Sequence, residues 1–187
     1  MWFKVIVAIL PAAIIGIPLD DLFEEKFHNY IVVSLALIVY GIAFIVIEKR
    51  NKHLKPKVGS IGEITYKTAF LIGCFQALSL IPGTSRSGST ILGSILIGVS
   101  RVTAAQFSFY MAVPVMFGAS FIKLLKFGLD FTSTELIILL VGMVTAFLVS
   151  VIAIKFLMNY IKKRDFTAFG YYRIVLGVIV LLYFVLK

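Results

Sequence analysis

Long apolar segments alternate with short charged segments along the whole chain. Runs without a charged side chain extend over residues 5–19, 29–47, 102–122, 136–154 and 174–186. A helix that spans a membrane needs about 20 apolar residues, with a range of roughly 17 to 25. The middle three runs reach this length alone, and aromatic or snorkelling residues at the ends extend the first and the last. The pattern predicts about five membrane-spanning helices.

The region of residues 68–100 does not follow this pattern, because Arg86 divides it into two shorter uncharged halves. Residues 68–81 and residues 87–100, each taken as a helix, are about 21 Å long, which is less than the hydrocarbon core of about 30 Å. A single straight helix would overshoot the core and would hold Pro82 and Gly83 in its interior. Two half-length helices joined by a turn near mid-membrane, as a re-entrant hairpin or a broken helix, agree better with the sequence.

The charges of the connecting segments favour the hairpin. The segment "EKRNKHLKPK" at 48–57 is basic and "DDLFEEKFH" at 20–28 is acidic, so the former is expected in the cytoplasm. If residues 68–100 enter and leave on one side, "KKR" at 162–164 also falls in the cytoplasm. If the region crossed the membrane, the same basic residues would lie outside, against the positive-inside tendency.

Composition supports an integral membrane protein of the all-α class. The 187 residues are 60% hydrophobic and 14% charged, and the mean hydropathy is +1.04. Soluble globular proteins contain about 25% charged residues. The net charge of +9 is interpreted as membrane orientation by cytoplasmic lysines and arginines, not as nucleic-acid binding. The single cysteine, Cys74, excludes an internal disulfide and a cysteine-based metal cluster.

The segment "SLIPGTSRSGST" at 79–90 places polar groups where lipid would surround them. An arginine at membrane depth costs roughly 2.5 to 3.5 kcal/mol on insertion scales, and a bound anion would offset this cost. The open N–H groups and dipole at the start of the second half-helix also favour an anion. The groups suited to a phosphate are the forked donors of Arg86, the hydroxyls of Ser85, Ser87, Ser89 and Thr90, and the backbone of Gly83 and Gly88.

Helix packing is the alternative interpretation of these small residues. A serine-rich contact between helices accounts for Gly88, Ser89, Gly93 and Ser94, but it does not account for Arg86. The sequence therefore favours an anion site, and packing is compatible with it at other residues. Gln76 precedes the turn in an apolar segment, where it either lines the same cavity or forms a hydrogen bond across helices.

The peptide "PGTSRSGST", the run "IGVSRVTAAQFSFYMAVPVMFGA" and the upstream "TYKTAFLIGCFQALSLIPG" closely resemble the second signature region of the undecaprenyl-diphosphate phosphatase family, the bacitracin-resistance membrane proteins. The resemblance implies a multi-pass protein of the bacterial cell membrane, with inverted repeats and two re-entrant hairpins. This chain would lack the N-terminal third of a family member and would contain one hairpin, half of the inverted-repeat architecture. It implies removal of the terminal phosphate from undecaprenyl diphosphate, which recycles the lipid carrier of cell-wall synthesis. Arg86 would bind phosphate, with Ser85, Ser87 and Thr90 as the hydroxyls of the signature.

One part of the family pattern is absent. The other signature is a glutamate pair four residues apart, followed by a proline and a serine-rich turn that ends in glycine-histidine. Asp20/Glu24 and Asp21/Glu25 have the spacing but not the turn, and are interpreted as an acidic external loop. The resemblance implies Mg²⁺ or Ca²⁺, held by the missing glutamates, so no metal ligand is expected here. The chain is thus expected to be a truncated form with little activity alone.

Two other functions are compatible with the sequence. A transporter or lipid flippase also uses broken helices near the midplane, and an inactive fragment would only pack against other membrane proteins. An intramembrane carboxylate pair upstream would separate a phosphatase from a transporter. His28 and His53 are interpreted as solvated loop residues. The expected partners are a polyprenyl diphosphate and the membrane, with self-association left open.

Overall fold

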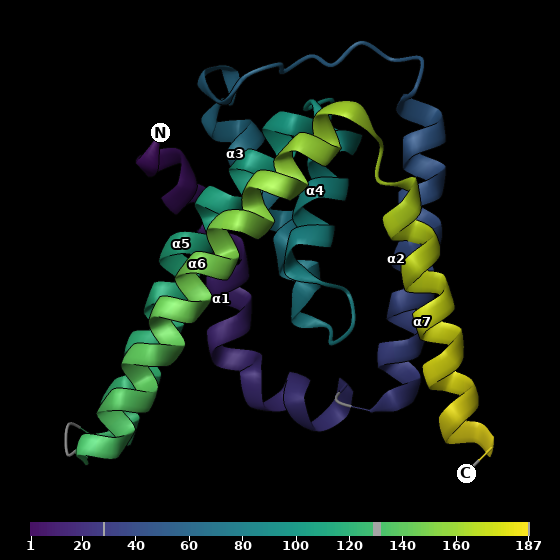
Figure 1. Cartoon of the computed structure of the whole chain (residues 1–187). Coiled ribbons are helices and arrows are strands. Elements are labelled where there is room, and N and C mark those ends of the chain that lie inside the picture. Colours follow the sequence, from purple (N-terminus) through teal and green to yellow (C-terminus); the bar gives the residue numbers. More distant parts are fainter. Residues whose placement is uncertain (28, 129–131, 187) are drawn as a thin grey trace. The chain divides into compact units, whose positions relative to one another are not determined.

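A computed structural model of the chain describes residues 1–27, 29–128 and 132–186, with the side chains of 17, 20–24 and 127 left out. The described residues form helices and no strand, which confirms the all-α class (Figure 1). The elements in order are α1 (Trp2–Phe27), α2 (Tyr30–Asn51), η1 (Ile61–Glu63), α3 (Tyr66–Ala77), η2 (Leu78–Leu80), α4 (Arg86–Leu96), α5 (Arg101–Phe127), α6 (Ser133–Lys163) and α7 (Thr167–Leu186).

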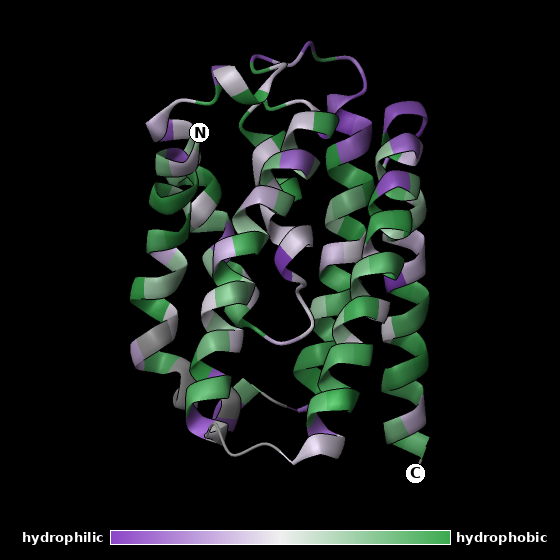
Figure 2. Ribbon diagram, turned by 60° about the vertical axis from the view of Figure 1, so that its left-hand side comes forward, coloured by the Kyte–Doolittle hydropathy of each residue, from purple (hydrophilic) through white to green (hydrophobic). Residues whose placement is uncertain are grey.

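Among the described residues, four helices, α2, α5, α6 and α7, are long and apolar enough to cross a membrane. They coincide with the last four of the predicted spans. Figure 2 shows apolar ribbon along most of the helices and polar ribbon mainly at helix ends and connecting segments. The first predicted span lies in α1, whose apolar described part, Trp2–Gly16, is shorter than a full span. A fifth span therefore stays a prediction.

The predicted acidic loop at residues 20–28 is wrong for the backbone of residues 20–27, which continues α1. Leucine, glutamate and lysine are good helix formers, so charge alone does not end a helix there. The side chains of Asp20, Asp21 and Glu24, and all of His28, lie outside the described residues. His53 follows the end of α2 and is exposed, as expected.

The chain divides into two compact units. One contains Met1–Met111 and Asp165–Lys187, and the other contains Ala112–Arg164. In the second unit, α6 begins with a capping box in which Thr132 Oγ1 accepts from the Glu135 N–H at 3.3 Å and Glu135 Oε2 accepts from the Thr132 N–H at 2.8 Å. Most of α6 is exposed and apolar, as a lipid-facing helix should be.

In the first unit, close backbone contacts hold the helices together. A Cβ at Gly41 of α2 would lie 2.7 Å from the Gly170 carbonyl oxygen of α7, and one at Gly73 of α3 would clash with the Ala8 carbonyl oxygen of α1. Only glycine allows the helices to approach this closely. Small residues at such contacts are the usual means by which helices associate in lipid.

Helices α3 and α4 are short, with 12 and 11 residues. Figure 1 shows the chain turning back between them within the first unit. The segments that flank the pair lie side by side, because the Lys57 N–H donates to the Gly98 carbonyl oxygen at 2.8 Å and the Ser100 N–H donates to the Val58 carbonyl oxygen at 2.9 Å. The α3–α4 hairpin therefore begins and ends at the same end of this unit.

Candidate functional site

The turn between α3 and α4 is closed by its own polar groups. The Thr84 hydroxyl lies 2.8 Å from the Ile81 carbonyl oxygen and 3.2 Å from that of Leu78, and the side chain is buried. Gly83 has a φ of 91°, and a Cβ there would lie 2.7 Å from the Val33 carbonyl oxygen of α2. The turn thus requires glycine both for its dihedral angle and for its approach to α2.

Ser85 is the N-cap of α4 and has a φ of 65°, the only positive φ at a non-glycine residue in the described part of the chain. Its Oγ accepts a hydrogen bond from the Gly88 N–H at 3.3 Å. A non-glycine residue in this region costs of order 1–3 kcal/mol and is found mainly at functional sites. The exposed Ser85 therefore marks the turn as a candidate binding site.

The start of α4 keeps open donors. The Ser89 N–H donates to the Ser85 carbonyl oxygen at 3.0 Å, and the Gly88 N–H is capped by Ser85. Within the described residues, the N–H groups of Arg86 and Ser87 have no acceptor. These N–H groups and the positive end of the helix dipole form a site that attracts anions. The partly buried side chain of Arg86 begins from the same turn of helix.

A second arginine, which the sequence analysis did not identify, lies against this turn. Arg173 of α7 donates from Nη2 to the Gly83 carbonyl oxygen at 2.5 Å. Its Nη1 would lie 3.2 Å from a Cβ at Gly88, and its guanidinium carbon is 5.8 Å from the centre of the Tyr40 ring. Its buried Nε has no hydrogen-bond partner in the described part of the molecule. An arginine within the apolar α7 was the signal that could have identified it.

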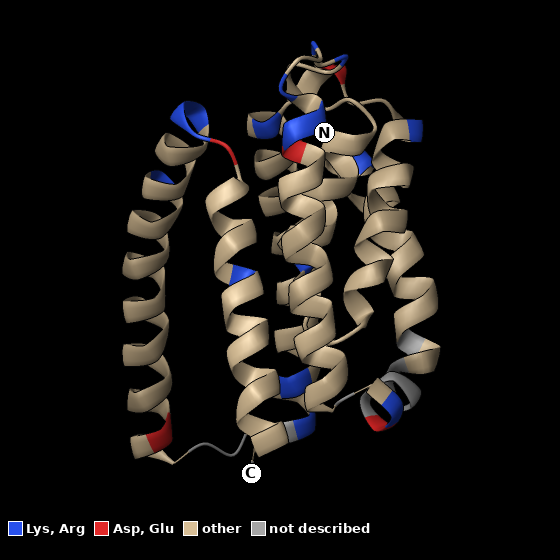
Figure 3. Ribbon diagram, turned by 90° about the vertical axis from the view of Figure 1, so that its right-hand side faces the viewer, with Lys and Arg blue, Asp and Glu red and all other residues tan. Residues whose placement is uncertain are grey.

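Figure 3 shows the basic residues mainly at helix ends, with a few Lys or Arg positions partway along otherwise uncharged helices. Arg173 is the only charged residue of α7. Arginines in such positions are costly unless they meet an acceptor or line a polar cavity. The carbonyl of Gly83 meets one donor of Arg173 and leaves the others available.

The remaining candidates differ in how far their polar groups are already engaged. The Ser89 hydroxyl donates to the Tyr40 hydroxyl at 3.0 Å, and the Thr90 hydroxyl donates to the Arg86 carbonyl oxygen at 2.7 Å. Both side chains are buried. Their hydroxyl protons thus stabilise the turn and the first helical turn of α4. Ser87 is only partly buried, and Gln76 is buried in α3.

The packing interpretation holds for two residues further along α4. Ser94 is fully buried, and its hydroxyl donates to the Thr90 carbonyl oxygen at 2.7 Å. Gly93 lies against the ring of Phe75, where a Cβ would clash. Gly93 thus allows α3 to pack closely on α4, and the hydrogen bond of Ser94 lies within α4, while the open donors lie at the start of α4.

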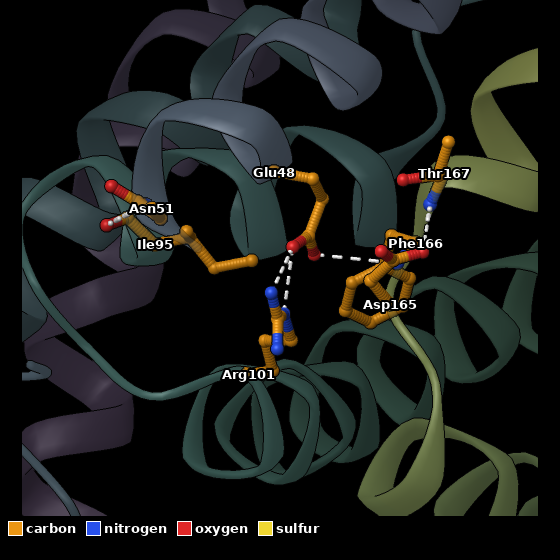
Figure 4. Close-up of polar contacts among 7 residues, drawn as sticks. All are labelled: Glu48, Asn51, Ile95, Arg101, Asp165, Phe166 and Thr167. Carbon is orange, nitrogen blue, oxygen red and sulfur yellow. Dashed lines mark hydrogen bonds and ion pairs between the residues drawn. The ribbon is translucent and has the colours of Figure 1, made fainter. Parts of the chain in front are cut away.

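Glu48 was expected to belong to a basic loop, and this expectation is wrong. Because α2 continues to Asn51, Glu48 lies within the helix, and the residue is 2% exposed (Figure 4). Its Oε2 accepts from Arg101 Nε at 2.7 Å. Among the described residues, no three His, Cys, Asp or Glu side chains are placed to hold a metal ion.

Comparison with known proteins identifies relatives over nearly the whole chain. The family model of the bacitracin resistance protein BacA matches residues 1–179. The chain is 63% identical over 184 residues to an undecaprenyl-diphosphatase of Acetivibrio thermocellus, covering 98% of this chain and 68% of the relative. It is 62% identical over 185 residues to an undecaprenyl-diphosphatase of Desulfitobacterium hafniense, covering 98% and 66%. The chain thus spans about two thirds of the length of these relatives.

Proposed function

This chain belongs to the family of the bacitracin resistance protein BacA, and we propose that it binds the diphosphate of its substrate, undecaprenyl diphosphate, at the turn of the α3–α4 hairpin. The reaction is hydrolysis of this lipid to undecaprenyl phosphate and inorganic phosphate, in a multi-pass protein of the cell membrane. The family does not favour the transporter or flippase alternative. Self-association stays a prediction.

The observation that carries the proposal is the convergence of unsatisfied donors at the start of α4. The N–H groups of Arg86 and Ser87 lack acceptors within the described residues, and Arg173 adds a buried Nε without a partner. A diphosphate supplies several charged acceptor oxygens. Arginine binds such oxygens with two parallel hydrogen bonds, and a helix N-terminus adds its dipole.

The residues divide into two roles. Phosphoryl transfer requires that the charge on the phosphate oxygens be neutralised. This role falls to Arg86, Arg173 and the exposed hydroxyl of Ser85. Ser87, partly buried in the first turn of α4, adds a further hydroxyl donor. Thr90 and Ser89 hold the turn in shape through the hydrogen bonds described above. Gly88 leaves room beside Arg173, and Gly83 lets the turn approach α2.

The membrane position of the turn is part of the proposal. Helices of 12 and 11 residues reach about 18 and 16 Å at 1.5 Å per residue, which is near half of a core about 30 Å thick. A re-entrant α3–α4 hairpin would bring the turn to the depth where Arg86 and Arg173 need an anion. The prenyl chain of the substrate would then lie in the surrounding lipid.

A requirement for Mg²⁺ or Ca²⁺ stays a prediction from the family resemblance. Both cations need several oxygen ligands. The described residues bring no three His, Cys, Asp or Glu side chains together for a metal ion, so we derive no step of the reaction through a cation. The role proposed for this chain is to bind the diphosphate and neutralise its charge.

A binding measurement tests the proposal without turnover. The probe is the methylene-diphosphonate analogue of farnesyl diphosphate, which has no hydrolysable P–O–P bond, titrated into the purified protein in phosphate-free detergent. We expect Arg86→Ala and Arg173→Ala each to weaken binding about tenfold or more, since hydrogen bonds to charged groups contribute about 1.5–3 kcal/mol. The exposed Arg50 on α2 gives a matched control, and Arg50→Ala should bind as the unmodified protein does. Unchanged affinity in both site variants would refute the proposal.

A further inference from the structure

Glu48 connects three segments of the first unit through one buried carboxylate (Figure 4). Its Oε2 forms an ion pair with Arg101, at 2.7 Å from Nε and 2.5 Å from Nη2. Its Oε1 accepts a hydrogen bond from the Phe166 N–H at 3.3 Å. Arg101 begins α5 directly after the α3–α4 hairpin, and Phe166 directly precedes α7. The carboxylate of α2 therefore holds both the exit of the hairpin and the start of α7.

The same elements meet again at the candidate site. Tyr40 of α2 accepts a hydrogen bond from Ser89 of α4, and Arg173 of α7 donates to Gly83 in the turn. Tyr40 precedes Glu48 by about two helical turns, and Arg173 follows Phe166 by about two. The chain thus has two polar layers that join α2, the hairpin and α7, one at Glu48 and one at the turn.

Between these layers, α2 meets α7 and its start through glycine, aliphatic and aromatic groups, including the rings of Phe44 and Phe166, whose centres lie 5.8 Å apart. Gly41 approaches the backbone of Gly170 and the side chain of Ile174. Dispersion contacts of this kind are weakly directional, whereas an ion pair with two hydrogen bonds has one favoured geometry. The Glu48 layer is therefore the part of the structure that can fix the position of α7 along α2.

Stability alone is a poor explanation for this carboxylate. Burying a carboxylate has a large desolvation cost, and apolar replacements of buried ion pairs are often as stable or more stable. The side chain of Glu48 is 1% exposed, while that of Arg101 is 35% exposed and can still reach water. The desolvation cost thus falls mainly on Glu48.

We propose that Glu48 is a positioning residue for the anion site. By holding Arg101 and the start of α7 against α2, it keeps Arg173 beside Gly83 and Gly88, where the guanidinium can meet a phosphate. Glu48 does not itself touch the substrate. This inference rests on the proposed function, because it matters for the reaction only if Arg173 binds the diphosphate.

Two variants separate positioning from folding. Glu48→Gln removes the charge but keeps an acceptor for the Phe166 N–H. Glu48→Gln/Arg101→Met removes both charges and leaves that N–H satisfied, so it should melt close to the unmodified protein. We expect both variants to bind the diphosphonate analogue about tenfold more weakly, the size of one lost hydrogen bond to a charged group. The exposed Glu25 supplies the control Glu25→Gln, which should change neither the melting temperature nor the affinity for the diphosphonate analogue.

A double-mutant cycle tests whether Glu48 acts through Arg173. If it does, Glu48→Gln in the Arg173→Ala background should cause no further loss of affinity, whereas independent effects would add. Recovery of full affinity in Glu48→Gln/Arg101→Met, or additive losses in the cycle, would overturn the inference. Unchanged affinity in Arg173→Ala would instead overturn the assignment of Arg173 to the diphosphate site, on which the inference rests. Loss in Arg173→Ala with none in Glu48→Gln would overturn the positioning role alone.

Discussion

The guanidinium of Arg173 donates a hydrogen bond to the carbonyl oxygen of Gly83 at 2.5 Å, across 90 residues of sequence. This contact places an arginine of the last helix against the hydroxyl-rich turn of the α3–α4 hairpin. The carbonyl oxygen of Gly83 is thereby engaged, and the neighbouring donors at the start of α4 are left for an anion. The stability of the turn should therefore depend on Gly83, and the binding of an anion there should depend on Arg86 and Arg173.

Arg86 is expected to act through the shape of its guanidinium as well as its charge. Arg86→Lys keeps the charge but loses the planar fork, so it should reduce phosphate release from undecaprenyl diphosphate, and Arg86→Ala should reduce it more. Loss of one well-placed electrostatic group commonly costs about 10²- to 10³-fold in rate. The measurement is phosphate release by membranes containing each variant, normalised to the amount of folded protein. Near-normal release by Arg86→Ala would contradict the assignment of Arg86.

Gly83→Ala should destabilise the turn. The φ of 91° is unfavourable for alanine, and the new Cβ would lie 2.7 Å from the Val33 carbonyl oxygen. We expect a loss of about 1–3 kcal/mol, seen as a lower melting temperature in detergent. Gly118 in α5 is the matched control, because a Cβ added there would meet no atom within 4 Å. Gly118→Ala should keep or raise the melting temperature, because alanine favours helix.

The segment between the basic residues 48–57 and α3 contains a pH-dependent contact. The Gly59 N–H donates to Glu63 Oε2 at 2.7 Å and the Ser60 hydroxyl donates to Oε1 at 2.9 Å. These bonds, the one from Gly59 first, lower the pKa of Glu63 from its ordinary value. A lowered folded-state pKa gives stability that is full above the unfolded value of about 4.3 and is lost as the pH falls through the folded-state pKa.

The comparison of Glu63→Gln with the unmodified protein tests this contact. The unmodified protein should melt higher at neutral pH, and the difference should shrink as the pH falls below the ordinary carboxyl value. Glu25→Gln, at an exposed glutamate, should show no such difference. A difference that is constant with pH would show that the charge of Glu63 does not contribute.

The α3–α4 hairpin is predicted to enter and leave the membrane on one side. Lys67 lies at the start of α3 and Leu96 at the end of α4, and both are exposed. Single cysteines at these positions, in a Cys74→Ser background, should react with an impermeant thiol reagent from the same face of the membrane. Reaction from opposite faces would exclude the re-entrant arrangement.

Sequence alone predicts the local features of this molecule better than the distant ones. The short helices follow from charge spacing, since Lys67, Arg86 and Arg101 bound the two uncharged runs. The role of Arg173 could not be predicted, because the Gly83 carbonyl oxygen that accepts its hydrogen bond is 90 residues away. Glu48 was assigned to a loop for the same reason, since the residue that it contacts is distant in sequence. Its neighbours are lysine and arginine, and its partner Arg101 lies 53 residues later.

The central claim, that the two arginines bind the diphosphate, is tested most directly by nitrogen–phosphorus dipolar coupling in solid-state NMR. The sample is the protein with ¹⁵N-labelled arginine side chains, in a phosphate-free glycolipid, with the diphosphonate analogue bound. The account predicts dephasing of guanidinium signals by ³¹P, reduced in Arg86→Ala, reduced in Arg173→Ala and absent when both are replaced. No dephasing in the unmodified protein, or dephasing that persists in the double variant, would contradict it.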